Sequence, residues 1–156
     1  ELRLALNAGS VQENDNQLGL AHFMEHMGFN GSKNFPKNEL VDFLQKTGVD
    51  FGADLNAYTS FDETVYILSL PTEDAGMVDK GFTVLEDWAF NNLLDKAEIE
   101  KERGVVLEES RLSKGSWERM SRQYFPKLLN GSKYAVRLPI GKPRGRSSAN
   151  KSSPGK

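Results

Sequence analysis

The stretch that decides the fold spans residues 18–32 and reads LGLAHFMEHMGFNGS. Its apolar residues cover a wide face at helical spacing, so the pattern predicts a helix over residues 17–29. The Asn-Gly-Ser run at residues 30–32 is typical of the end of a helix. The only histidines of the chain, His22 and His26, both lie in this predicted helix. The chemistry that they support therefore depends on how this one segment is placed.

The two histidines and Glu25 form the pattern His-x-x-Glu-His. Side chains four residues apart share one face of a helix, so both imidazoles can reach one point. Glu25 lies one residue before His26 and can approach the same point without binding a metal itself. The pattern is the inverse of the commoner His-Glu-x-x-His zinc motif. A catalytic zinc takes three protein ligands and keeps another position open for water, so we expect an acidic ligand from elsewhere in the chain.

An acidic segment at residues 98–109 offers the candidates for that third ligand. Glu102 and Glu109 are seven residues apart, about two helical turns, and lie on nearly the same stripe of a helix. Glu108 faces roughly 100° away from that stripe. Helical geometry therefore favours Glu102, Glu109 or both over Glu108. It leaves the choice between the first two open.

The alternative to a metal site is a solvated helical face stabilised by pairs of opposite charge. A single histidine on a helix is more often packed or solvated than bound to a metal. This alternative suits several of the charged residues, namely Glu98, Glu100, Lys101 and Glu108. It suits His22 and His26 poorly, because they sit among Leu, Phe and Met residues. The spacing of the two histidines, with Glu25 between them, favours a metal site.

Patterns elsewhere in the chain predict strands mixed with helices. We expect a strand over residues 2–8, loop and edge-strand segments over 49–60, and a strand over 64–70. We expect helices from Pro36 to Gly48, from Thr72 onward, from the capping residue Asp95 to Leu112, and over residues 117–129. We interpret several large apolar residues as core or packing residues, namely Phe23, Met24, Met27, Phe29, Trp88 and Trp117. Strands and paired helices without regular βαβ alternation favour an α+β layer fold.

The composition is that of an ordinary globular protein, with 38% hydrophobic and 27% charged residues. No apolar run approaches the roughly 18 residues that span a bilayer, so we expect no membrane partner. The chain has no cysteine, which excludes a thiolate as metal ligand or nucleophile. A metal site in this chain must therefore use imidazole and carboxylate groups.

The net charge of −2 conceals an uneven distribution. Six basic residues and no acidic ones lie from Arg137 onward, whereas the preceding part holds 14 basic and 22 acidic residues. An acidic body binds phosphate poorly, so we expect no nucleic acid as a partner. Residues 143–156 form a basic tail rich in Ser, Gly and Pro, which we expect to be disordered or artificially added. A nucleic-acid-binding arm is the less favoured interpretation of this tail.

Four segments in order, at residues 22–26, 28–33, 56–60 and 102–109, resemble the N-terminal domain of the insulinase (pitrilysin, M16) family of zinc metallopeptidases. The resemblance runs from about residue 2 to residue 141. It implies an α+β fold with an antiparallel-rich sheet covered by several helices. It also implies a site in which zinc is bound by His22, His26 and Glu109. In the same comparison Glu25 is the general base that activates water, and Glu102 supports activity without binding the metal.

The resemblance further implies a zinc-dependent endopeptidase that hydrolyses peptides or small proteins. Asn56, Ala57 and Tyr58 would border the cleft and pair with an extended substrate as an added strand, although the residues themselves indicate only an edge strand or loop. Members of the family work with a homologous C-terminal half or a partner subunit, and the bacterial members imply a periplasmic or other extracytoplasmic location. The alternative is a non-catalytic, structural or peptide-presenting homologue. Such members typically have a damaged motif, and here the motif is whole.

The chain differs from the family's N-terminal domain at both of its ends. The chain opens at Glu1 instead of Met, and after Gly141 it turns into the basic tail where the family's domain continues with helix and strand. We therefore expect residues 1–142 to be a partial, truncated peptidase domain without its partner half. Zinc binding by the chain is consequently a stronger prediction than peptidase turnover.

Overall fold

The computed structural model describes residues 1–37, 39–46, 48–49, 52, 55–73, 75–113 and 115–141, without the side chain of Trp117. The expected tail at 143–156 and the domain boundary at 142 lie outside the described residues. The elements follow one another as β1 (Leu2–Leu6), α1 (Leu20–Met27), α2 (Glu39–Lys46), β2 (Leu55–Thr59), β3 (Thr64–Leu68), α3 (Ala75–Phe90), α4 (Lys96–Leu112), α5 (Ser116–Leu128) and the short 3₁₀ helix η1 (Lys133–Ala135).

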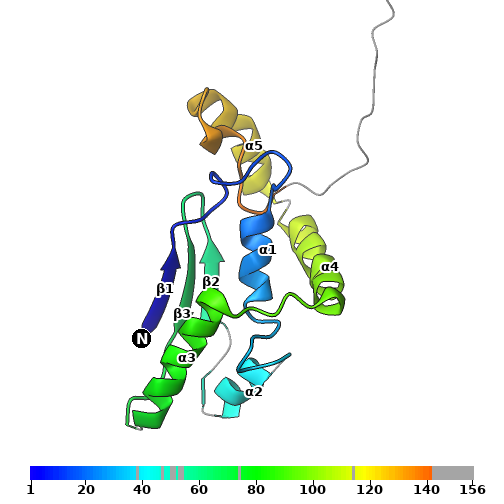
Figure 1. The fold of residues 1–156 in the computed structure, drawn as a ribbon. Helices are drawn as coiled ribbons and strands as arrows, with labels where there is room; N and C mark the ends of the chain where they lie inside the picture. The colour runs from blue at the N-terminus through cyan, green and yellow to red at the C-terminus, as the bar shows by residue number, and fades with distance from the viewer. Residues whose placement is uncertain are drawn as a thin grey trace, which may run out of the picture.

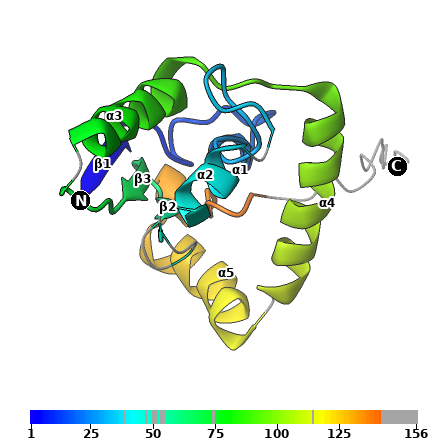
Figure 2. The same ribbon diagram turned by 90° about the horizontal axis from the view of Figure 1, so that it is seen from below.

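The strands form one antiparallel sheet in the order β1-β3-β2. Figure 1 shows α1 lying between β2 and α4, with α3 and α2 below and α5 above. The view from below shows the same arrangement, with α1 and α2 between the sheet and α4 (Figure 2). The predicted α+β class, with an antiparallel sheet and several covering helices, is confirmed. No helix in the described ranges is both long and apolar enough to cross a lipid bilayer.

The main core lies where α2 and α3 meet the sheet. Eight buried residues form it: Leu40, Leu44, Val49, Leu55, Tyr66, Leu68, Val84 and Trp88. The rings of Tyr66 and Trp88 stack with their centroids 4.9 Å apart, and Phe29 packs edge-on against Trp88 at 5.8 Å. The expected burial of Trp88 and of Met27 is confirmed, whereas Phe23 and Met24 are half-buried. Phe29, in the segment that follows α1, therefore packs directly against this core.

Helix α1 is shorter at its start than its apolar pattern predicts. The pattern runs back to residue 17, but Gly19 adopts a left-handed φ of 86°, which ends the helical path just before Leu20. The buried carboxylate of Glu13 accepts hydrogen bonds from the backbone N–H groups of Gly19 and Ala21, at 2.9 and 2.8 Å. Glu13 thus satisfies two of the N–H groups that every helix start leaves without a partner.

The other end of α1 is held by two core side chains. The Tyr66 hydroxyl donates to the Met24 carbonyl at 3.1 Å, and the Trp88 indole donates to the Gly28 carbonyl at 3.0 Å. Burial, and to a smaller extent the charge of Glu25, raises the pKa of Tyr66, so its hydroxyl remains a donor. A Cβ on Gly28 would lie 2.7 Å from Tyr66 Cε1, so only glycine allows this close approach. The sheet and α3 therefore fix the C-terminal end of α1.

Helix α2 begins at Glu39, later than the predicted start at Pro36. Lys37 adopts a positive φ of 56°, so the helix does not extend back to the proline. Helix α4 begins as predicted, because Asp95 accepts hydrogen bonds from the N–H groups of Ala97 and Glu98. The Glu98 carboxylate pairs with Lys101 on the surface.

Asp87 of α3 anchors the loop that leaves α1. Its buried carboxylate accepts hydrogen bonds from Ser32 Oγ at 2.5 Å, from the backbone and side chain of Asn34 at 2.9 and 2.8 Å, and from Asn91 at 3.0 Å. Burial alone would raise the pKa of Asp87, but these hydrogen bonds outweigh burial and hold the pKa below its ordinary value. The ionised form is therefore the one that the fold stabilises.

The lowered pKa of Asp87 predicts a loss of stability in acid. This stabilisation is present above the unfolded-state pKa of about 3.9 and is lost as the pH falls through the lower folded-state value. We expect Asp87→Asn to lower the free energy of unfolding by roughly 1–3 kcal/mol at pH 7. The difference from the unsubstituted chain should shrink at pH 3. Urea unfolding at both pH values measures it, and an equal difference at both would contradict the assignment.

Candidate metal centre

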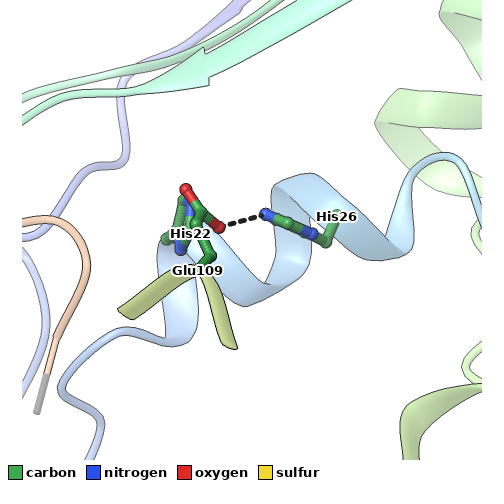
Figure 3. A group of neighbouring side chains, drawn as sticks. All are labelled: His22, His26 and Glu109. Atoms are coloured by element: carbon green, nitrogen blue, oxygen red, sulfur yellow. Dashed lines mark ion pairs between the residues drawn. The ribbon is translucent and has the colours of Figure 1, made fainter. Parts of the chain in front are cut away.

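His22 and His26 of α1 meet Glu109 of α4 at one point. One atom from each side chain lies within 4.8 Å of the others. Glu109 Oε2 is 3.5 Å from His22 Nε2 and 3.2 Å from His26 Nε2, and the two imidazole rings lie edge to face with centroids 4.7 Å apart. Figure 3 shows the three side chains directed toward one another from the two helices. The helical spacing of the histidines thus brings both rings to the same carboxylate.

The acidic residues of α4 that the sequence leaves as alternatives lie in three different places. Glu109 faces the Nε2 atoms of both histidines, whereas Glu102 lies 2.8 Å from Nδ1 of His26, on the other side of that ring. Glu108 points away and pairs with Arg111 on the surface. The group that can hold a metal ion therefore contains Glu109 and neither of the others.

Glu102 determines which nitrogen of His26 carries a proton. Its carboxylate is buried and also accepts a hydrogen bond from the Asn30 amide at 2.8 Å, and the same amide reaches the His26 carbonyl at 3.2 Å. An ionised carboxylate only accepts hydrogen bonds, so His26 Nδ1 must be the donor. Nε2 of the neutral ring then keeps its lone pair, directed toward Glu109. This is the usual arrangement behind a metal-binding histidine.

One carboxylate oxygen at this point has no hydrogen-bond donor among the described residues. Glu109 Oε2 is buried and has no hydrogen-bond partner in that part of the chain. Bringing a buried carboxylate oxygen and an imidazole lone pair together is costly unless a proton or a metal cation lies between them. Imidazole nitrogen and carboxylate oxygen are the ligand atoms that zinc prefers in sites without cysteine. The residues present thus fit a divalent cation.

The electrostatics of His22 favour the same conclusion. Burial lowers the pKa of His22, the charge of Glu109 opposes this effect, and the neighbouring His26 adds to it. The net result is a lowered pKa, so the neutral imidazole is the favoured form near pH 7. Only the neutral form has a lone pair for a metal ion.

Glu25 lies beside this group without belonging to it. Its side chain is buried, and its Oε2 accepts a hydrogen bond from Thr59 Oγ1 of β2 at 2.6 Å. Its charge acts on the pKa of His22, which places the carboxylate within electrostatic reach of that ring. Glu25 is thus a carboxylate held between the face of α1 that carries the two histidines and the edge of the sheet.

Asn56, Ala57 and Tyr58 lie on β2, the edge strand beside α1. Ser60 N–H donates to the Glu63 carbonyl at 2.7 Å, which sets the register of the hairpin. Bonded and non-bonded pairs alternate along antiparallel strands, so the backbone groups of Asn56 and Tyr58 face β3.

The backbone groups of Ala57 and Thr59 consequently face the open edge of the sheet. The Ala57 N–H is occupied by the Oδ1 atom of Asn56 at 2.9 Å. The Tyr58 side chain is exposed and donates its hydroxyl to Glu63 at 2.9 Å. Among the described residues, the side-chain hydrogen bonds of these three residues run to Gly52, within β2 and to Glu63, and none reaches His22, His26 or Glu109.

Two residues at this site receive no role in the sequence-based reasoning. Asn30 lies in the turn that follows α1, where its side-chain amide bonds to both the His26 carbonyl and the Glu102 carboxylate. Thr59 lies in the 56–60 stretch, and strand alternation puts it on the same side as Ala57. The positions of both residues can be read from the local sequence. Their roles depend on partners in other elements, namely Glu102 of α4 for Asn30 and Glu25 of α1 for Thr59.

With this fold and this cluster described, the chain can be compared with known proteins. Residues 1–135 match the family described as Insulinase (Peptidase family M16). The chain therefore belongs to the insulinase family of peptidases, the class of protein that its sequence resembles.

Two relatives and one crystal structure illustrate the extent of the match. "Probable zinc protease PqqL" of Escherichia coli (strain K12) is 42% identical over 140 residues, which are 90% of this chain and 15% of that protein. "Mitochondrial-processing peptidase subunit beta" of Homo sapiens is 42% identical over 106 residues, 68% of this chain and 20% of that protein. The crystal structure of the first half of the periplasmic protease PqqL from Escherichia coli superposes with a TM-score of 0.86 at 41% identity, covering 90% of this chain and 30% of that one. The chain thus spans a small part of each of these relatives.

The contact with Glu102 predicts the tautomer of His26. In the metal-free chain at pH 8 we expect the proton on Nδ1, because that nitrogen donates to the Glu102 carboxylate. Long-range ¹H–¹⁵N NMR correlations distinguish the two ring nitrogens. Glu102→Leu removes the acceptor and should abolish the preference. A predominant Nε2–H form in the unsubstituted chain would contradict the arrangement.

Proposed function

We propose that this chain carries the zinc centre of a peptidase that hydrolyses peptide bonds with activated water. The single observation behind this proposal is the convergence of His22, His26 and Glu109 on one point, with the buried carboxylate of Glu25 on the same helix. Membership of the insulinase family supports it, as does the name of the Escherichia coli relative, a zinc protease.

His22, His26 and Glu109 are the residues that would hold zinc. Zinc in such a site lowers the pKa of a water molecule toward neutrality and polarises a carbonyl group. Glu102 and Asn30 keep the His26 ring in the orientation and tautomer that leave Nε2 available. The neutral His22 meets the other requirement, that each imidazole ligand offer a lone pair.

Glu25 is the proposed general base. A carboxylate that takes the proton from water and later gives it to the leaving amine needs to lie near the reacting groups without binding the metal. Glu25 is buried one residue from His26 and lies outside the three-residue group, which suits this role. The Thr59 hydroxyl occupies Oε2, so Oε1 is the oxygen free of that hydrogen bond.

The open edge of β2 is the proposed substrate-binding surface. An extended peptide that adds to this edge as a strand would bond to the backbone groups of Ala57 and Thr59 that face outward. A substrate carbonyl would replace the Asn56 Oδ1 atom on the Ala57 N–H. Asn56 and Tyr58 would contact the peptide through their exposed side chains. The substrate class that follows is an unfolded peptide or a small protein with an extended segment.

The partner and the location are proposed from the relatives. The chain spans 15% of the Escherichia coli relative, and the related crystal structure is described as the first half of a periplasmic protease. We propose that a homologous second half or partner subunit completes the substrate chamber, and that the protein acts in the periplasm or a comparable compartment. The three proposed zinc ligands all lie in this chain.

The ligand assignment predicts the effect of four substitutions on zinc binding. The purified chain should hold about one zinc ion, and the double variant His22→Ala, His26→Ala should hold none. We expect Glu102→Gln to weaken zinc binding by about 10–100-fold and Glu109→Gln to weaken it further, because Glu102 acts only through His26.

Metal analysis and a competitive zinc indicator measure these affinities. Glu108→Gln is the matched control, since Glu108 pairs with Arg111 away from the site and should bind zinc normally. A larger loss in Glu102→Gln than in Glu109→Gln would show that the two glutamates had been exchanged.

The proposed base predicts a separation of binding from turnover. In the whole protein to which this chain belongs, Glu25→Gln should keep zinc and lower kcat for cleavage of an unstructured fluorogenic peptide by at least about 100-fold. Cleavage at the unsubstituted rate would refute the general-base role. An unsubstituted protein that binds zinc and peptide without cleaving would favour the peptide-presenting alternative.

A further inference from the structure

Thr59 connects the edge strand to Glu25. It is the last residue of β2, and its Oγ1 lies 2.6 Å from Glu25 Oε2. The distance is that of a hydroxyl hydrogen bond to an ionised carboxylate, which is about twice as strong as a bond between neutral groups. This is the contact by which the sheet holds the Glu25 side chain.

The hydroxyl of Thr59 has one proton, and the neighbouring groups leave it to Glu25. Thr64 Oγ1 lies 3.4 Å from Thr59 Oγ1, too far to compete with the bond to the carboxylate. Thr64 uses its own proton on the Ala8 carbonyl at 2.8 Å. The two threonines therefore have separate partners, although they face each other in the hairpin.

The turn beside Thr59 is fixed by packing against the C-terminal part of the chain. Phe61 packs against the rings of Phe125 and Tyr134, at centroid distances of 6.2 and 5.3 Å. The Tyr134 hydroxyl donates to Asp62 at 2.5 Å. Thr59 thus stands beside a turn that is packed against the C-terminal part of the chain, and its backbone N–H and carbonyl face the open edge.

We infer that Thr59 is a positioning residue for the reaction, because it holds one oxygen of Glu25 through its hydroxyl while its backbone lies on the proposed substrate edge. This inference rests on the proposed function. Thr59 then positions both the general base Glu25, through its hydroxyl, and a peptide bound along β2, through its backbone. The second oxygen of Glu25 is left for proton transfer.

If Thr59 positions Glu25, removing its hydroxyl should lower the rate of peptide cleavage and leave peptide binding almost unchanged. Thr59→Val keeps the shape and the strand preference but removes the hydroxyl. In the whole protein with zinc bound, we expect kcat for a fluorogenic peptide to fall by about tenfold or more, the size of one lost bond to a charged group. KM should stay within about twofold, since the backbone edge is unchanged. Thr59→Ser restores the donor and should restore most of kcat.

Two further measurements separate positioning from general damage to the fold. Thr64→Val removes the neighbouring hydroxyl, which serves the Ala8 carbonyl, and should lower stability while leaving kcat within about twofold. Crystal structures of the metal-free variants provide a measurement that does not depend on activity. The Glu25 carboxylate should leave its position in Thr59→Val and keep it in Thr59→Ser.

Each outcome bears on a different claim. A kcat unaffected by Thr59→Val, with Glu25 in its original position in the crystal, would overturn the positioning role and leave the proposed function standing. An equal loss of kcat in Thr64→Val would also overturn it, because the effect would then belong to the hairpin as a whole. An unsubstituted protein that holds zinc and cleaves no peptide would instead overturn the proposed function.

Discussion

The site depends on the way a helix of only two turns is held at both ends. Helices as short as α1 are not stable on their own, so tertiary contacts must fix it. Glu13 satisfies the N–H groups at its start, and Tyr66 and Trp88 bond to carbonyl groups at its end. These side chains come from a loop, the sheet and α3. The direction in which His22 and His26 point is consequently a property of the whole core, although the motif itself is local.

Helix α4 contributes two carboxylates with different tasks. Glu102 and Glu109 lie two turns apart on one stripe, and both reach α1. One bonds to Nδ1 of His26 and sets its tautomer, while the other faces Nε2. A single imidazole ring thus lies between a carboxylate that orients it and a carboxylate that shares its proposed ion. The acidic surface residues of the same helix, such as Glu108, pair with neighbouring arginine or lysine and take no part.

The sequence predicts most of the fold and the identity of the two histidines, because helical periodicity and the His-x-x-Glu-His spacing are local properties. It does not choose between Glu102 and Glu109, which are equivalent on an isolated helix and become different only when α4 is placed against α1. It also misses Thr59, whose meaning depends on the register of a hairpin and on a residue 34 positions away. The start of α1 is predicted too early, because an apolar pattern does not reveal the left-handed backbone at Gly19. The sequence therefore predicts which residue types take part, but it does not predict how elements distant in the chain are placed against one another.

The hydrogen bond from the Ala57 N–H to the Asn56 side chain has a consequence for solubility. An open sheet edge attracts other strands, and proteins that expose one risk joining edge to edge with copies of themselves. An edge that is proposed to bind extended peptides carries the same risk. The Asn56 side chain occupies the outward-facing Ala57 N–H, so one backbone donor fewer is available for pairing with another strand. The proposed peptide substrate would have to displace the Asn56 oxygen to bond there.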